Sequence, residues 1–368
     1  MRQVHFLAGR EHLEDRKQPR DAIIRRAVVK RIDGAVRDWL MALKAERVIV
    51  AATGGFPVVG KLVEEIVRLY AAPSAKVETL EIADGAKAKP PMKDRAVSRQ
   101  RIPEPAASYQ ARRHALELIN RGNLLGAWGA VQHLHEDEIE RQWTRIIEWL
   151  ACFAASLPMP GDCNIPVLTD KRMALRAGLR VELALRAGDI PRAVHGTIAF
   201  FEAAFWDHLG PCVTRHDDPK KRQLYKLDPA PGDDLVRRGD GTSEDRKRPF
   251  EVNEEDDTRW YKVFDDDVCA TRLAKHYLQQ ESLQKLGQAV SGVRDLRNDV
   301  AHNEPTPELM HDAHAKMVKA QLWSSEGRFL SQPLVQNVLR ELRVEHPDSL
   351  CISLVSTVRE RLLELRTP

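Results

Sequence analysis

The sequence is poor in the features that define several common protein classes. Its five cysteines, none of them in a Cys-x-x-Cys pair, are Cys152, Cys163, Cys212, Cys269 and Cys351. This scatter disfavours a disulfide framework and a structural zinc site, and it favours a reducing compartment. No apolar run approaches the roughly 18 residues that a transmembrane helix needs, and the amino terminus lacks the basic and then apolar pattern of a secretory signal. We therefore expect a cytoplasmic protein without a membrane-embedded segment.

The chain also lacks an excess of charge of either sign. It has 57 Lys and Arg residues against 54 Asp and Glu residues, a formal net charge of +3. This balance excludes a strongly basic nucleic-acid coat protein and a highly charged disordered tail. Contact with nucleic acid must then come from a local concentration of positive charge. Two basic tripeptides, 220–222 and 246–248, are interleaved with acids, so we interpret them as solvated loops rather than guides for RNA.

The length of 368 residues predicts two or three domains, of which the first is α/β. Residues 35–43 have helical spacing of apolar residues. The short apolar run Val48–Ala52 is typical of a strand buried on both faces. A helix with apolar residues from Val58 to Leu69 follows, and Lys76–Ile82 resembles a second strand. This strand–helix–strand order predicts a parallel pair with a right-handed crossover.

The remainder is predicted to be helical apart from two segments. Residues 83–107, rich in Pro, Ala, Lys and Arg, are predicted to be a linker. Residues 214–257 are rich in charge, proline and glycine and have too little apolar surface for a core, which predicts a solvated insertion. Helical periodicity covers 115–119, 124–134, 139–153, 173–185 (with arginines on its outer face) and 190–209, and it resumes from about Asp266 into the tail at 333–363.

The segment Leu283–Pro305 carries the densest set of chemically versatile residues. Its apolar residues form one helical stripe, and Arg297 falls inside this stripe. A guanidinium on the packed side of a helix must be paired or must face a ligand or a subunit interface. Arg294, Asn298 and His302 follow one another at i, i+4 and i+8 and therefore share a neighbouring face. The proline that closes the segment is expected to stop the helix just beyond the histidine.

These residue types suit phosphodiester chemistry. Histidine exchanges a proton near neutral pH, arginine holds a phosphate through paired donors, and asparagine can orient either group. Because RNA contains its own nucleophile, the 2′-hydroxyl, such a site could cleave it without a metal. The structural alternative is a buried ion pair for Arg297 and a helix-end position for His302 that the helix dipole favours. A further hypothesis is that Glu202 pairs with Arg294 or Arg297.

The run Arg297-Asn298-Asp299-Val300-Ala301-His302 resembles the R-x4-H motif of HEPN ribonucleases, with an Asn after the Arg. The resemblance implies that the motif ends a helix of an all-α bundle and that two copies form one composite, metal-independent site across a homodimer. Arg297 and His302 are about 140° apart on an ideal helix, which agrees with a site shared by two subunits. It also implies products with a 2′,3′-cyclic phosphate and a 5′-hydroxyl. The implied roles are proton transfer by His302, phosphate and transition-state stabilisation by Arg297, orientation by Asn298 and support by Arg294.

The run Val48–Pro57, with the helix after it, resembles the strand–loop–helix of CARF domains. That resemblance implies contact of the loop with cyclic oligoadenylate. Glycines allow backbone N–H groups to approach a phosphate, and a helix amino terminus favours an anion. Only 47 residues precede Val48, with Val4–Gly9 as the other strand candidate, so the domain is short for this family. The implied ligand-binding residues are Thr53, Gly54, Gly55, Phe56 and Lys61.

The two resemblances together predict an α/β plus all-α protein. We expect a short Rossmann-like, CARF-like domain at 1–107, a helical connector at 108–188 and a HEPN bundle at 189–368 with a charged insertion at 211–264. This order is similar to that of CRISPR type III ancillary ribonucleases, which implies antiviral defence, a single-stranded RNA substrate, a homodimer, cyclic oligoadenylate as activator and no metal or other cofactor. Two alternatives stay open: a HEPN toxin-like ribonuclease without a second messenger, and a catalytically silent, nucleotide-sensing module that contacts a partner protein.

Overall fold

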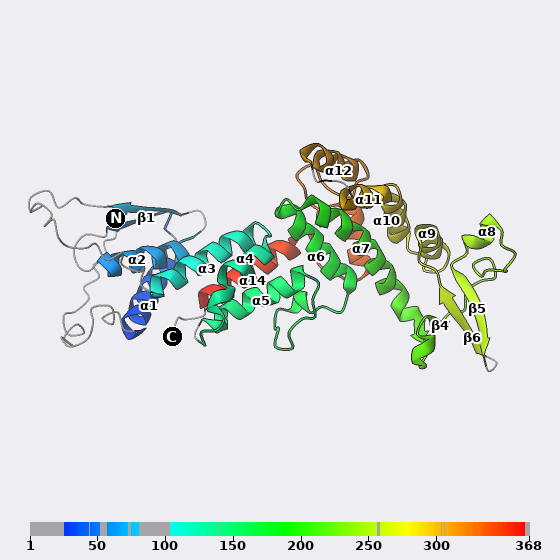
Figure 1. The fold of residues 1–368 in the computed structure, drawn as a ribbon, viewed down its shortest axis with the longest axis horizontal. Coiled ribbons are helices and arrows are strands. Elements are labelled where there is room, and N and C mark those ends of the chain that lie inside the picture. Colours follow the sequence, from blue (N-terminus) through cyan, green and yellow to red (C-terminus); the bar gives the residue numbers. More distant parts are fainter. Residues whose placement is uncertain are drawn as a thin grey trace, which may run out of the picture. The chain divides into compact units, whose positions relative to one another are not determined.

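The computed structural model describes residues 26–43, 45–51, 57–72, 75–80, 104–138, 140–255, 258–302, 304 and 306–364. Within these ranges the chain is mostly helical, with a two-stranded and a four-stranded sheet (Figure 1). This confirms the predicted combination of α/β and helical parts. The chain divides into two compact units: Met1–Glu117 with Gly126–Glu148 and Val358–Pro368, and Leu118–Leu125 with Trp149–Thr357. The functional division at 107 and 188 stays a prediction.

The first unit contains the predicted strand–helix–strand motif. Its elements are α1 (Arg26–Leu43), β1 (Arg47–Ala51), α2 (Pro57–Tyr70) and β2 (Lys76–Leu80). The two strands are parallel, with Arg47 opposite Lys76 and Ala51 opposite Leu80, as expected. Val48 and Val50 are buried, whereas Ile49 is 43% exposed. The expectation of a strand buried on both faces is therefore wrong for β1, because alternate side chains point to opposite faces and one of these faces is open at Ile49.

The other helices of the first unit pack around the buried guanidinium of an arginine, Arg112. The elements with residues in it are α3 (Glu104–Asn120), α4 (Leu124–Val131), a 3₁₀ turn (Gln132–Leu134), α5 (Arg141–Ala154) and α14 (Leu350–Glu364). Residues 104–107, predicted as linker, form the first turn of α3. Arg112 on α3 is fully buried, with its guanidinium 4.9 Å from the Trp143 ring centroid and 3.4 Å from the Leu362 carbonyl oxygen. Ring and carbonyl compensate part of the cost of burying this charge.

Two antiparallel helices, α6 (Met173–Arg186) and α7 (Ile190–Leu209), form the centre of the second unit. Gly188 connects them at φ +73°, a left-handed conformation that glycine adopts without strain. The Asp189 side chain then caps α7 by accepting the Arg192 N–H at 3.1 Å. On α6, Arg180 is half-buried against the Phe153 ring and donates to the Phe153 carbonyl. It does not lie on an outer face as expected, and burial lowers its pKa.

The segment after α9 (Asp267–His276) forms two helices where one was predicted. α10 (Glu281–Ser291) and α11 (Arg294–His302) are separated at Gly292, the C-cap of α10. A glycine weakens a helix interior and favours a helix end, so the helix is interrupted here, although the apolar residues predicted as one stripe are all buried. α10 buries Leu283, Leu286 and Val290 and packs on α7, α9 and α13 (Pro333–Glu341). α12 (Pro307–Lys319) packs against both α7 and α11.

The predicted solvated insertion is instead a folded sheet at the carboxyl end of α7 (Figure 1). Its elements are β3 (Val213–Arg215), β4 (Leu224–Leu227), the short α8 (Ser243–Arg246), β5 (Phe250–Glu255) and β6 (Thr258–Val263), and the antiparallel strand order is β3-β4-β6-β5. The expectation failed because a few well-separated apolar residues are enough for a small core. These are Leu224, Tyr225, Leu227, Leu235, Phe250 and Tyr261, all buried.

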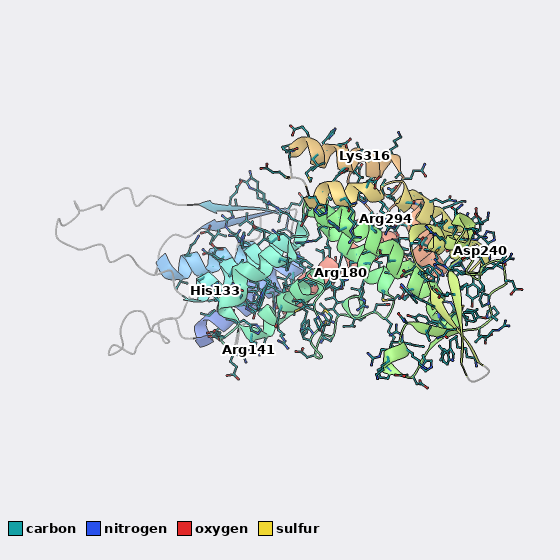
Figure 2. All side chains as sticks on the ribbon, turned by 45° about the vertical axis from the view of Figure 1, so that its right-hand side comes forward. His133, Arg141, Arg180, Asp240, Arg294 and Lys316 are labelled. Carbon is teal, nitrogen blue, oxygen red and sulfur yellow. The ribbon has the colours of Figure 1, made fainter. Side chains whose placement is uncertain are left out.

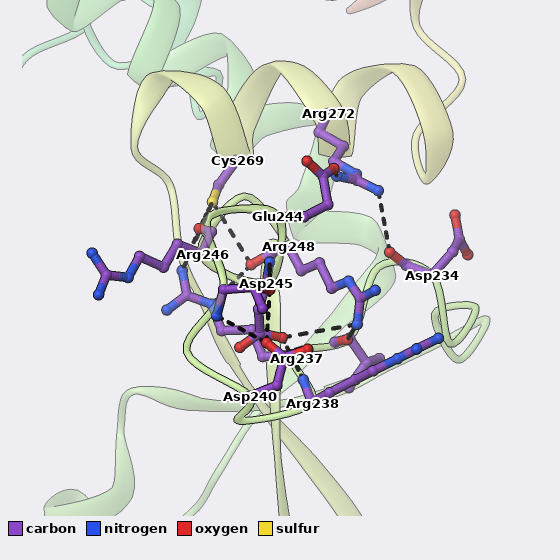
Figure 3. Close-up of polar contacts among 12 residues, drawn as sticks. Asp234, Arg237, Arg238, Asp240, Glu244, Asp245, Arg246, Arg248, Cys269 and Arg272 are labelled. Carbon is purple, nitrogen blue, oxygen red and sulfur yellow. Dashed lines mark hydrogen bonds and ion pairs between the residues drawn. The ribbon is translucent and has the colours of Figure 1, made fainter.

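The charges of the insertion are largely used to hold its own loop together, as Figure 3 shows. Arg237 donates to the carbonyl oxygens of Arg248 and Arg246, at 2.9 and 3.1 Å. The buried Asp245 accepts the Arg238 N–H at 2.6 Å, and Arg272 of α9 pairs with Glu244 at 2.7 Å. Arginines that bond backbone carbonyls replace some of the apolar burial that a larger core would supply.

Candidate functional site

The R-x4-H residues lie on α11, and two buried side chains of α11 pack it against the helical bundle. Leu296 and Val300 are buried, and α11 packs on α7 and α12. Arg294, Arg297, Asn298 and His302 are all exposed. Figure 2 shows Arg294 on α11, with Lys316 on the neighbouring α12. The helix therefore presents its polar residues to solvent and its apolar residues to the bundle.

Arg297 is exposed, which corrects the expectation that it occupies the packed side of its helix. The expectation continued the apolar stripe of α10 through residue 302, whereas the break at Gly292 starts α11 as a new helix. In α11 only positions 296 and 300, four residues apart, are buried, and 297 lies one step away from this line. The alternative of a buried ion pair for Arg297 is thereby also wrong.

The exposed motif residues span the whole of α11, from its first residue, Arg294, to its last, His302. Arg294, Asn298 and His302 follow at four-residue intervals along one side, and Arg297 is about 140° from His302 around an ideal helix. A single α11 thus offers phosphate-binding and proton-exchanging groups that point in different directions.

The structure adds a residue that the sequence analysis did not select, His195 on α7. It is half-buried, and its pKa is lowered by burial and then by the positive charge of Arg297. The effect of Arg297 on this pKa indicates that the second imidazole lies near the motif. Helical spacing could have suggested it, since His195 lies seven residues before Glu202 and hence on the same face of α7. Glu202 itself is exposed, and its pairing with Arg294 or Arg297 stays a hypothesis.

Of the predicted ligand-binding residues, the structure describes one, Lys61. Thr53, Gly54, Gly55 and Phe56 lie outside the described residues, as does Val4–Gly9. The Lys61 ammonium on α2 is 3.0 Å from Glu65 Oε1 and 3.3 Å from Glu64 Oε2, and the hydrogen bond to Glu65 is the main reason that its pKa is raised. Lys61 is therefore a fully charged group that an anionic ligand would share with these two carboxylates.

The described residues contain no group of three or more His, Cys, Asp and Glu side chains arranged to hold a metal ion. Within the same part of the chain, no helix is both long enough and apolar enough to cross a bilayer. The residues of α11 that carry the motif are proton-exchanging and charge-stabilising groups. This composition is suited to acid–base chemistry on a phosphodiester.

Comparison with known proteins gives one structural similarity. No protein-family model and no curated protein matches the chain. Among solved structures, the chain is similar to Enterococcus italicus Csm6 bound to cyclic hexa-2′-fluoro-hexa-dAMP, at 12% sequence identity over 90% of this chain and 80% of that chain, with a TM-score of 0.43. At this TM-score the similarity assigns neither a family nor an activity to the chain.

Proposed function

We propose that the chain is a metal-independent endoribonuclease that cleaves single-stranded RNA at a site formed by α11 and its copy in a homodimer. The observation that carries this proposal is the exposure of Arg297, Asn298 and His302 together on one short helix. A structural role would bury or pair the guanidinium of such a motif. An arginine, an amide and an imidazole left to solvent beside one another are instead available to a phosphodiester and to a second subunit.

The chemistry follows from the substrate. The 2′-hydroxyl of the nucleotide before the scissile bond attacks phosphorus, so the 2′-O–P bond forms and the P–O5′ bond breaks. One imidazole takes the 2′-hydroxyl proton, and a protonated imidazole donates a proton to the leaving 5′-oxygen. Arg297 stabilises the charge that develops on the non-bridging oxygens, and Asn298 orients the phosphate, with Arg294 in support. The products are a 2′,3′-cyclic phosphate and a 5′-hydroxyl.

The same proposal assigns the amino-terminal α/β region a regulatory role in type III CRISPR antiviral defence. The parallel β1–α2–β2 motif brings the carboxyl end of β1 to the amino end of α2, where Lys61 lies one turn into the helix. This is the place at which α/β proteins commonly hold phosphates. Cyclic oligoadenylate bound there would favour the dimer arrangement in which the two α11 helices meet, because a ligand shifts a conformational equilibrium by its differential affinity.

The motif is tested by RNA cleavage in EDTA, with and without cyclic oligoadenylates of each ring size. We expect wild-type protein to cleave a fluorescent single-stranded RNA and His302→Ala and Arg297→Ala each to lower the rate by about 10²-fold or more, the usual effect of removing an acid–base or charge-stabilising group. His276→Ala and Arg340→Ala, which change exposed residues of α9 and α13, are the matched controls and should retain activity.

The outcomes separate the alternatives. A strict need for a divalent metal, or unchanged rates in both motif variants, contradicts the nuclease site. Cleavage that no ring size accelerates favours the toxin-like ribonuclease without a second messenger. A wild-type protein that binds cyclic oligoadenylate and cleaves no RNA is the silent, nucleotide-sensing module.

A further inference from the structure

The insertion sheet has one face turned to the helices and one face turned away from them. Tyr225 and Tyr261 are opposite each other in neighbouring strands and therefore share a face. Tyr225 contacts Trp206 of α7, with ring centroids 5.6 Å apart, so this face is the packed one. The other pair of the same register, Leu224 opposite Lys262, must then lie on the opposite face.

That opposite face carries two aromatic rings in contact with each other, tilted by 45° between their planes. Trp260 lies two residues before Lys262 in β6 and so shares its face, and its ring centroid is 4.3 Å from that of His216. The backbone N–H of Asp218 donates to His216 Nδ1 at 3.0 Å, which fixes the orientation of the imidazole. Both rings are only half-buried. Because of this tilt the two rings do not form one flat surface, but the partly exposed Trp260 ring by itself offers a plane on which another planar group can stack.

Positive charge surrounds the two rings. Lys226, two residues beyond Leu224 in β4, is exposed, and Lys262 is half-buried. The connection between β3 and β4 adds the exposed Lys220 and Arg222 and the half-buried Lys221, together with the acids Asp217 and Asp218. Glu251, opposite Lys262 in β5, is an acid on the same face, so the local balance is positive without being uniform. We call the surface formed by His216, Lys226, Trp260 and Lys262, which lies over the buried Leu224, the Trp260 face.

We propose that the Trp260 face binds single-stranded RNA, with a base stacked on the Trp260 ring beside His216 and the adjoining phosphates held by Lys226 and Lys262. Aromatic side chains within a positively charged surface are the general means of binding single strands without reading their sequence. An acidic peptide would engage the lysines and leave the ring pair without a planar partner. The choice of RNA as the polyanion rests on the proposed function. The site belongs to the insertion and is separate from α11, so it would hold the substrate strand outside the point of cleavage.

Binding is measured on the full-length His302→Ala protein by fluorescence anisotropy of a labelled, mixed-sequence single-stranded RNA. We expect Trp260→Ala to raise Kd by about tenfold, in the range of one lost base–aromatic stack, and Trp260→Phe to raise it much less, because a ring remains. The pair Lys226→Gln with Lys262→Gln should lower the slope of log Kd against log salt concentration by about 1.4, since each phosphate contact on a single strand contributes roughly 0.7.

The control is Lys285→Gln, an exposed lysine of α10, which should change neither Kd nor the salt slope beyond a small general charge effect. The lysine variants keep the ring pair, so they report on binding even if Trp260→Ala disturbs the sheet. An unchanged Kd in Trp260→Ala together with an unchanged salt slope in the lysine pair would overturn the proposal. So would displacement of the RNA by poly-glutamate at equal residue concentration, which would indicate an acidic protein partner.

Failure here is distinguishable from failure of the nuclease. A chain that cleaves RNA with full dependence on His302 and is indifferent to Trp260 retains the proposed function and loses the Trp260 face. A chain that binds RNA through Trp260 and never cleaves it has the opposite outcome.

Discussion

Glu182 is a buried carboxylate that organises the second unit from within α6. Its side chain is 4% exposed, and its Oε2 accepts the N–H groups of Phe329 and Leu330 at 2.8 and 3.2 Å. Its Oε1 accepts from Arg186 at 3.2 Å and from Arg328 at 3.4 Å. One carboxylate therefore accepts the backbone hydrogen bonds of the segment that leads into α13 and balances the positive charge of two guanidinium groups.

Replacing this carboxylate should destabilise the fold strongly. We expect Glu182→Gln to lower the free energy of unfolding by about 2–4 kcal/mol. The amide has no charge to balance the two arginines, and its NH₂ group would face buried N–H groups that now donate to the carboxylate. The matched control is Glu281→Gln, whose carboxylate is 77% exposed and pairs with Lys285. It should change stability by less than about 1 kcal/mol. Urea unfolding measures both, and equal effects of the two variants would contradict a special role for Glu182.

Among the helices, the close contact of α10 with its neighbours depends on Gly287. A Cβ at this position would lie 2.8 Å from Thr271 Oγ1 of α9 and 3.0 Å from the Phe201 ring of α7. These helices can approach one another closely because residue 287 has no side chain. The position of α10, and of α11 immediately after it, therefore depends on a glycine at residue 287.

Adding one methyl group tests this packing. Gly287→Ala should lower the free energy of unfolding by about 1–3 kcal/mol, because overpacking of a buried contact outweighs the higher helix propensity of alanine. Gly129→Ala, in α4 where a Cβ would meet nothing within 4 Å, should instead stabilise the protein by about 0.5–1 kcal/mol. Thermal unfolding of the two variants compares them directly. A stabilising Gly287→Ala would mean that α10 can move without cost.

For the chain as a whole, the proposed site is incomplete in one copy, so activity should depend on association. The rate of RNA cleavage per mole of chain should fall on dilution below the dimer dissociation constant, and the fall should be less steep when cyclic oligoadenylate is present. Analytical ultracentrifugation over the same concentrations gives the fraction of dimer. Activity per mole that stays constant while the dimer dissociates would contradict a site shared between subunits.

Helix positions and the β1–α2–β2 motif were largely predictable, because they depend on short-range periodicity and on turn residues. The helix expected at 190–209 begins and ends at those residues. Its cap, Asp189, and the turn glycine before it are local features that operate in any tertiary context. The parallel pairing of β1 with β2 followed from the connection between them.

The insertion and the orientation of Arg297 were not predictable in the same way. The core of the insertion is formed by residues as distant as Tyr225 and Phe250, so the composition of a short window reports its many charges and misses the few apolar contacts. The apolar stripe identified Leu296 and Val300 as the buried residues of α11, but the exposure of Arg297 depends on how α11 meets α7 and α12, which the stripe does not contain.

The candidate site likewise has features that the sequence predicts and features that depend on tertiary contacts. Its motif residues are contiguous in the sequence, so Arg297, Asn298 and His302 could be named from the sequence alone, together with the chemistry that their side chains support. Their exposure, the neighbouring His195 and the Trp260–His216 pair arise from contacts between elements far apart along the chain. The sequence by itself determined the helices and the identity of the reactive groups, because these are local properties. Only the tertiary structure decided which of those groups meet solvent and which meet each other, because burial is a property of the packed neighbours and not of the residue.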